Sequence, residues 1–267
     1  MVHDGLSAKP TVRWADRALF IAVLALSATS LVSWLWFDER AFSQLSQTGV
    51  TWDDNFWVDV FTRLGKAWLQ IWLLLLWFVI SRRRHDVLAG LLALILVGIV
   101  VNPLKVAVQR TRPYTVLKVQ ATGQPDRKLT HHLSFPSGDT ASIFGVATAV
   151  LPAVGWPLRV LLLGSSAAIG GLRVTAMAHY PSDVLAGAAI GLLAGWLAIR
   201  LIDRWGHADR ALPFENWLVV AGVVGIPASQ CMSEGPAELI LLLRTYGLLV
   251  LCIALAVKIS AVVRRGG

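Results

Sequence analysis

The sequence VLAGLLALILVGIVVNPL, at positions 87–104, carries no charged side chain and is long enough for a helix that crosses a membrane. A hydrocarbon core of about 30 Å requires roughly 20 predominantly apolar residues in one helix. Similar uncharged runs precede and follow it, at 18–37, 67–81, 140–158, 160–172, 184–199, 216–233 and 245–257. The chain is therefore predicted to cross a membrane several times.

The composition of the whole chain also favours a membrane protein over a soluble one. Hydrophobic residues make up 56% of the 267 residues, and charged residues only 15%. A short run such as 160–172 would by itself suit a buried helix of a soluble domain. Together, however, the runs leave too little polar surface for a soluble exterior. We predict an all-α fold, a polytopic bundle of membrane helices.

The first run has features of a cleavable signal peptide, because Lys9, Arg13 and Arg17 precede it. Its length, and Trp34 and Trp36 at its far end, favour a retained membrane helix instead. The first six runs then form a predicted six-helix core within residues 1–210. The last two runs form a predicted C-terminal hydrophobic hairpin within residues 211–267, whose first arm either spans the membrane or re-enters it.

Basic residues in short loops predict the orientation, since such loops stay on the cytoplasmic side. They place both termini in the cytoplasm and the loops at 38–66, 105–137 and 173–182 outside. A bacterial inner membrane, with a periplasmic outer face, is the natural setting for this topology. The basic residues used are Lys9, Arg13, Arg17, Arg82, Arg83, Arg84, Arg159, Arg200, Arg204, Arg210, Arg264 and Arg265.

The outer loop after position 104 is unexpectedly basic, which suggests an anionic ligand. Lys105 and Arg112 are seven residues apart, so both face the same way if the helix continues past Pro103 until Arg112-Pro113 ends it. They would then grip a phosphate from one side. The alternative for either residue alone is that its side chain merely extends to the membrane boundary.

The segment Pro136-Ser137-Gly138 predicts a turn that opens the next helix. The unpaired amides and positive dipole end of a helix N-terminus form an anion site, and glycine lets a ligand approach the backbone. Ser137 either donates a hydroxyl to that anion or caps the helix.

The segment RVTAMAHYPSD, at positions 173–183, supplies candidate chemistry. Arg173 lies near the outer end of a membrane run, where a charge is costly and usually has a partner or a function. His179 and Asp183 are four residues apart, so the carboxylate is expected to reach one imidazole nitrogen and leave the other free to attack. A helix-terminal contact without catalysis is the simpler alternative for this pair alone.

Taken together, Lys105-x6-Arg112-Pro113, Pro136-Ser137-Gly138 and Arg173-x5-His179-x3-Asp183 resemble the three-part signature of the type 2 phosphatidic acid phosphatase family. The resemblance implies a six-helix membrane core and hydrolysis through a phosphohistidine, with no metal and no cofactor. It implies that His179 attacks phosphorus and that Asp183 orients His179. The implied phosphate-binding residues are Lys105, Arg112, Ser137, Gly138 and Arg173.

The sequence departs from the family pattern at one position. The family has histidine after Pro-Ser-Gly as the acid that protonates the leaving oxygen, whereas this chain has Asp139. One hypothesis keeps Asp139 as the acid, which requires a raised pKa. Another gives that role to His131 or His132, for which a solvated loop is the simpler interpretation.

The resemblance implies a lipid phosphate substrate that enters from the outer leaflet. Polyprenyl diphosphate, phosphatidylglycerol phosphate, phosphatidic acid and a phosphorylated glucosamine lipid all remain candidates. Lys118, Arg127 and Lys128 slightly favour a headgroup with more than one anion. The alternatives to hydrolysis are phosphate transfer between lipids, and binding or transport of a lipid phosphate. The net charge of +8 is better explained by the membrane topology and an anionic lipid substrate than by binding of a nucleic acid.

Overall fold

A computed structural model describes residues 10–47, 61, 63–122 and 133–205 of the chain. These residues form helices and, within the described ranges, no strand; Thr111 and Leu133 make one isolated β-bridge. The elements are α1 (Pro10–Trp36), α2 (Asp38–Gln47), α4 (Ala67–Ser81), α5 (Arg84–Val108), α6 (Pro113–Thr122), α7 (Gly138–Val150), a short 3-10 helix (Leu151–Ala153), α8 (Trp156–Thr175) and α9 (Pro181–Trp205).

The predicted all-α membrane fold is confirmed. Each of the first six apolar runs forms a helix, namely α1, α4, α5, α7, α8 and α9. Four of these helices are long and apolar enough to cross a membrane: Asp16–Trp36, Arg84–Val108, Trp156–Thr175 and Pro181–Trp205. Helix α4, with 15 residues, and α7, with 13, are shorter. The predicted C-terminal hairpin, at 216–233 and 245–257, lies outside the described residues.

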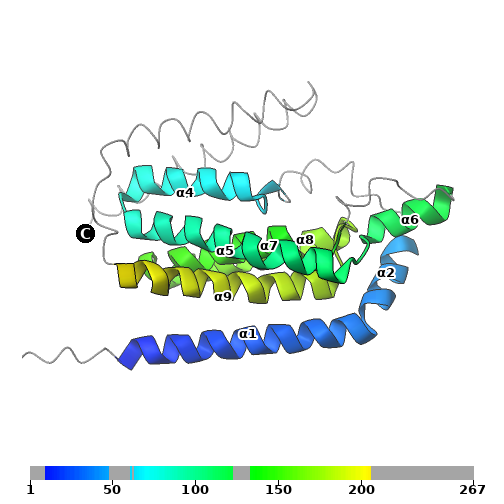
Figure 1. Ribbon diagram of the computed structural model, residues 1–267, viewed down its shortest axis with the longest axis horizontal. Helices are drawn as coiled ribbons and strands as arrows, with labels where there is room; N and C mark the ends of the chain where they lie inside the picture. The colour runs from blue at the N-terminus through cyan, green and yellow to red at the C-terminus, as the bar shows by residue number, and fades with distance from the viewer. Residues whose placement is uncertain (1–9, 48–60, 62, 123–132, 206–267) are drawn as a thin grey trace, which may run out of the picture.

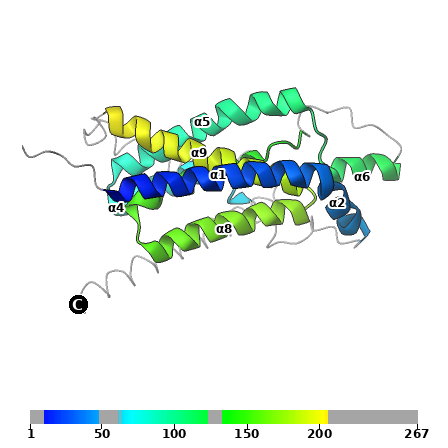
Figure 2. The ribbon, with the colours of Figure 1, turned by 90° about the horizontal axis from the view of Figure 1, so that it is seen from below.

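The six helices alternate in direction along the bundle (Figure 1). Consequently one end of the bundle collects the last residues of α1, α5 and α8 and the first residues of α4, α7 and α9. Helices α2 and α6 lie at this same end in both views (Figures 1 and 2). All three fragments of the predicted site are at this end, because they lie at the junctions between these helices.

Helix α7 lies at the centre of the bundle and packs most closely on α9. A stripe of glycines on α9, Gly187, Gly191 and Gly195, faces the α7 backbone. A Cβ atom on Gly187 would lie 2.5 Å from the Ser137 carbonyl oxygen, and one on Gly195 would lie 2.5 Å from that of Gly145. Only hydrogen atoms at these positions allow the two helices to approach so closely. The stripe therefore fixes the start of α7 against the start of α9.

The apolar core continues on the other faces of α7. Leu74 and Phe78 of α4 pack with Val146 and Val150 of α7 in one buried cluster, and Val87 of α5 joins them. Helix α1 packs on α9, on the outside of the bundle (Figure 2).

One expectation about α5 is wrong. The helix does continue past Pro103, but it ends at Val108, where Gln109 adopts a left-handed conformation with φ 52°. Arg112 therefore does not lie on the same helix face as Lys105. A short linker turns back instead, and its Thr111 pairs with Leu133 in the β-bridge.

Candidate active site

The start of α7 is built as the sequence suggested. Ser137 is the N-cap, and its hydroxyl accepts a hydrogen bond from the Thr140 amide at 3.4 Å. Its own amide donates to the Asp183 carbonyl oxygen at 3.0 Å. The capping interpretation of Ser137 is thus correct, and Ser137 is fully buried. Gly138, the first residue of the helix, adds the unpaired amides of a helix N-terminus.

His179 and Asp183 meet at the junction of α8 and α9. The His179 side chain is only 1% exposed, and its Nδ1 lies 3.5 Å from Asp183 Oδ2. The His179 amide donates to the Arg173 carbonyl oxygen at 3.1 Å, which ties the histidine to the end of α8. Because Nδ1 faces the carboxylate, Nε2 is the nitrogen that could attack a substrate.

The surroundings of His179 keep its imidazole neutral. Burial lowers its pKa from 6.5 to about 4, and the positive charges of Arg173 and Arg112 act in the same direction. The nearby carboxylate of Asp183 opposes this shift but does not overcome it. A neutral imidazole retains the lone pair that a nucleophile or a base requires.

The carboxylate of Asp183 is held from several sides. Its Oδ2 accepts hydrogen bonds from the Ser134 hydroxyl and from the Tyr180 amide, the latter at 2.8 Å. Its Oδ1 accepts one from Arg110 Nη1 at 3.0 Å. A buried carboxylate with these donors has a fixed orientation, so it can orient the imidazole in turn.

Arg110 also connects this carboxylate to the junction of α1 and α2. Its Nη2 lies 2.8 Å from Oδ2 of Asp38, which is buried and also accepts from the Ser182 hydroxyl. The guanidinium carbon lies 3.7 Å from the centre of the Tyr180 ring and 4.0 Å from that of Trp34. This Asp38–Arg110–Asp183 network was not predicted from the sequence.

Asp139, the residue that departs from the family pattern, lies between two cations. Its Oδ2 is 3.0 Å from Arg173 Nη2 and 3.7 Å from Lys66 Nζ. Lys66 caps the start of α4, and its side chain is 45% exposed. Two adjacent positive charges favour the ionised form of a carboxyl group, so Asp139 faces the site as a carboxylate before substrate binds.

Lys105 and Arg112 meet although they are not on one helix. Lys105 Nζ donates to the Leu133 carbonyl oxygen at 2.9 Å, and Arg112 Nε approaches the same oxygen at 3.4 Å. The β-bridge between Thr111 and Leu133 brings them together. Their shared acceptor is a neutral carbonyl group, so both cations keep their charge available for an anion.

Comparison with known proteins agrees with this geometry. The model of the PAP2 superfamily matches residues 86–207, the segment that contains every contact among the three sequence fragments. Residues 86–207 belong to the PAP2 superfamily. A solved structure, that of LpxE from Aquifex aeolicus, shares 26% sequence identity with a TM-score of 0.50. The match covers 61% of this chain and 94% of LpxE. No curated protein matches the chain in a comparison of sequences.

The match of residues 86–207 to PAP2, together with the likeness to LpxE and the helices long enough to cross a membrane, indicates a membrane phosphatase that acts on a lipid phosphate. The structure brings together the PAP2 signature residues predicted from sequence. Their individual roles in catalysis remain predictions. The residues are Lys105, Arg112, Ser137, Gly138, Asp139, Arg173, His179 and Asp183. His131 and His132 lie outside the described residues, so the second hypothesis for the acid stays untested.

The residues that sequence analysis missed surround the PAP2 signature. Arg110 lies inside the first fragment and Ser134 lies two residues before the second, but a loop cation and a loop serine carry no spacing that singles them out. Asp38 and Lys66 lie at the two ends of the 38–66 loop, which the sequence analysis only placed outside. In the described part of the chain, no three His, Cys, Asp or Glu side chains gather as they would around a metal ion.

Proposed function

We propose that this PAP2 chain hydrolyses a phosphomonoester or diphosphate of a membrane lipid through a phosphohistidine at His179. The observation that carries the proposal is the buried His179, whose Nδ1 lies 3.5 Å from Asp183 Oδ2 while its amide is bonded to Arg173. A neutral, oriented nucleophile thus lies next to a cation that can hold phosphate.

In the first step, His179 Nε2 attacks phosphorus and the bond from phosphorus to the lipid oxygen breaks. Negative charge on the phosphoryl oxygens is stabilised by Arg173, Lys105 and Arg112 and by the amides at the start of α7. Asp183 stabilises the positive charge that develops on the imidazole. The products of this step are the phosphohistidine and the leaving lipid oxygen.

Asp139 is the proposed proton carrier between the two steps. When the substrate phosphate binds Arg173, the guanidinium interacts less strongly with Asp139, and a dianion now lies beside the carboxylate. Both changes raise the affinity of Asp139 for a proton, which it can then give to the leaving oxygen. In the second step the resulting carboxylate accepts a proton from the water that attacks phosphorus. Phosphate leaves and His179 is regenerated.

The predicted orientation places this site at the periplasmic face of a bacterial inner membrane, open to the outer leaflet. The alternation of the six helices supports a common side for all three fragments, since they gather at one end of the bundle. The substrate panel remains the one derived from the family resemblance, namely polyprenyl diphosphate, phosphatidylglycerol phosphate, phosphatidic acid and a phosphorylated glucosamine lipid.

The experiment measures phosphate release by purified protein in detergent from each member of this panel. Wild type is compared with His179→Ala, and with Arg204→Ala as a control for an exposed arginine at the opposite end of α9. We expect release by wild type and by the control but not by His179→Ala. Quenching in alkaline denaturant during turnover should trap a phosphoryl group on the protein that survives alkali and is released by acid, as a phosphoramidate is.

Three results would contradict the proposal. Undiminished release by His179→Ala would exclude this histidine as the nucleophile. Binding of the lipids by wild type without release of phosphate would favour the binding or transport alternative. Transfer of the phosphoryl group to a second lipid, with no free phosphate, would favour the phosphotransferase alternative.

A further inference from the structure

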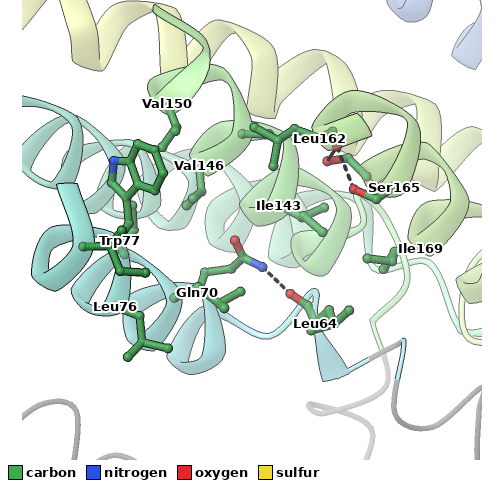
Figure 3. A pocket seen from close by; sticks show the side chains of 15 residues that line it. Leu64, Gln70, Leu76, Trp77, Ile143, Val146, Val150, Leu162, Ser165 and Ile169 are labelled. Atoms are coloured by element: carbon green, nitrogen blue, oxygen red, sulfur yellow. Dashed lines mark hydrogen bonds between the residues drawn. The ribbon is translucent and has the colours of Figure 1, made fainter. Parts of the chain in front are cut away.

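A cavity of about 330 Å³ lies between α4, α7 and α8 (Figure 3). Apolar side chains from all three helices line it, among them Trp77, Val146 and Leu162. Its polar side chains are turned to the backbone: Gln70 donates to the Leu64 carbonyl oxygen, and Ser165 and Ser166 donate to that of Leu162. The cavity is therefore suited to an apolar occupant.

The cavity continues from the candidate active site. Its lining residue Ile143 lies one helical turn after Asp139 on α7, and Ile169 lies one turn before Arg173 on α8. Leu64 lies two residues before Lys66. The ion pairs of Asp139 with Arg173 and Lys66 thus lie at one end of the cavity.

The other end of the cavity extends along the bundle toward the opposite face. Ile143 and Val150 both line it, and seven residues of helix span about 10 Å. Ile80, at the far end of α4, lines it and is 45% exposed, so this end reaches the surface of the bundle. An extended chain can follow this path from the polar site into the hydrocarbon core.

The direction of the reaction distinguishes this cavity from a second one of about 330 Å³, lined by residues of α1, α5 and α9. In an in-line displacement, the leaving group departs on the side away from the attacking nitrogen. The second cavity adjoins Ser30, whose hydroxyl bonds the Ser182 carbonyl, and so lies on the Asp183 side of the histidine. The first cavity lies on the Asp139 side, where the proposed function places the departing lipid oxygen.

We infer that the cavity between α4, α7 and α8 binds a hydrocarbon chain of the lipid phosphate substrate. This inference rests on the proposed function of the same site. It makes the cavity a determinant of chain length, with the ion pairs of Asp139 marking the boundary between headgroup and chain.

The test compares two single-chain substrates, dodecyl phosphate and butyl phosphate, through the ratio of their kcat/KM values. Ala147, a small buried residue of α7, lines the cavity, and Ala147→Phe places an aromatic ring inside it. The matched control is Ala186→Phe, the same change in the wall of the second cavity. We expect Ala147→Phe to lower the dodecyl-to-butyl ratio by about tenfold or more. A tenfold change corresponds to the binding free energy lost when roughly two methylene groups are no longer buried. We expect Ala186→Phe to leave the ratio as in wild type.

The possible outcomes separate this inference from the proposed function. Failure of wild type to hydrolyse either substrate would overturn both. Hydrolysis of both substrates with an unchanged ratio in Ala147→Phe would overturn the chain site alone. A lowered ratio in Ala186→Phe only would move the chain to the second cavity.

A second measurement does not depend on the folding of Ala147→Phe. An alkyl phosphate with a diazirine at its chain end is bound to His179→Ala protein and photolysed. Labelling of peptides from α4, α7 or α8 supports the inference. Labelling confined to α1 and α9 overturns it.

Discussion

Arg110 Nη1 lies 3.0 Å from Asp183 Oδ1, so the guanidinium holds this carboxylate through the oxygen that does not face His179. The same side chain pairs with Asp38 at 2.8 Å. One cation thus joins two buried carboxylates from distant parts of the sequence, and it fixes the junction of α1 and α2 against the start of α9. Arg110 is in this sense a positioning residue for His179, which it reaches only through Asp183.

Replacement of Arg110 by alanine is expected to lower kcat about 100-fold, with a much smaller change in KM. This loss is smaller than the about 10⁴-fold loss when the carboxylate of a Ser-His-Asp triad is replaced, because Asp183 keeps its bonds to Ser134 and Tyr180. The melting temperature should also fall, since two buried carboxylates lose their cation. Arg110→Lys should recover part of both. A folded Arg110→Ala protein with wild-type kcat would contradict the positioning role.

Replacement of Gly191 by alanine is expected to destabilise the bundle by roughly 1–3 kcal/mol, the usual cost of overpacking. The new methyl group would clash with the Ala141 carbonyl oxygen and would lie 2.7 Å from the Phe144 Cβ atom. Phosphate release should fall as well, because α7 carries Ser137 and Asp139. The control is Gly164→Ala on α8, where a Cβ atom meets nothing within 4 Å. Equal melting temperatures for the two variants would argue against the glycine stripe.

The imidazole of His179 is expected to titrate near pH 4 instead of near pH 6.5. Burial and the charge of Arg173 lower its pKa, while Asp183 raises it, so Asp183→Asn should lower the pKa further. Below pH 6.5 the unfolded chain binds a proton that the folded chain does not, so this group reduces stability as the pH falls. Imidazole resonances of labelled protein, assigned by comparison with His179→Ala, measure the midpoint. A midpoint above pH 6 would disagree with a buried, neutral histidine.

Asp139→Asn is expected to affect monoesters more than diphosphates. A lipid alkoxide needs a proton to leave, and loss of a general acid typically costs about 10²–10⁴-fold. A phosphate leaving group carries its charge without that proton, so turnover of a diphosphate should fall much less. Phosphate release from dodecyl phosphate and from dodecyl diphosphate provides the comparison. Equal, small losses on both substrates would transfer the acid role to His131 or His132.

Most of the fold was predictable because the length of the apolar runs and the placement of basic residues in alternate loops are strong local signals. The alternation of apolar runs with basic loops predicted the alternating helices that gather the three fragments at one end. The end of α5 was not predictable in this way. The chain leaves the helix at Gln109, whose left-handed backbone conformation follows no glycine or proline signal, and only the pairing of Thr111 with Leu133 returns Arg112 to Lys105.

The site was predictable where its residues lie close in sequence and only there. His179 and Asp183 are separated by one helical turn, so their contact follows from spacing. Asp38 follows α1 and Arg110 follows α5, and the two meet because both helices pack on α9, a relationship that no short motif encodes. The glycine stripe of α9 has a recognisable spacing of four residues, and this signal could have predicted its close contact with α7.

The pairing of Asp139 with Arg173 and Lys66 has a consequence for the lipids that surround the enzyme. Ordinary bilayer phospholipids are phosphodiesters that carry one negative charge on phosphorus, and they vastly outnumber any substrate. A phosphate that binds Arg173, as proposed, competes with an internal carboxylate, and we expect a monoanion to compete poorly. A terminal phosphate, with nearly two charges near neutral pH, can compete. On the proposed role of Arg173, Asp139 would thus act as an internal competitor that favours a terminal phosphate over the phosphodiesters of the surrounding membrane.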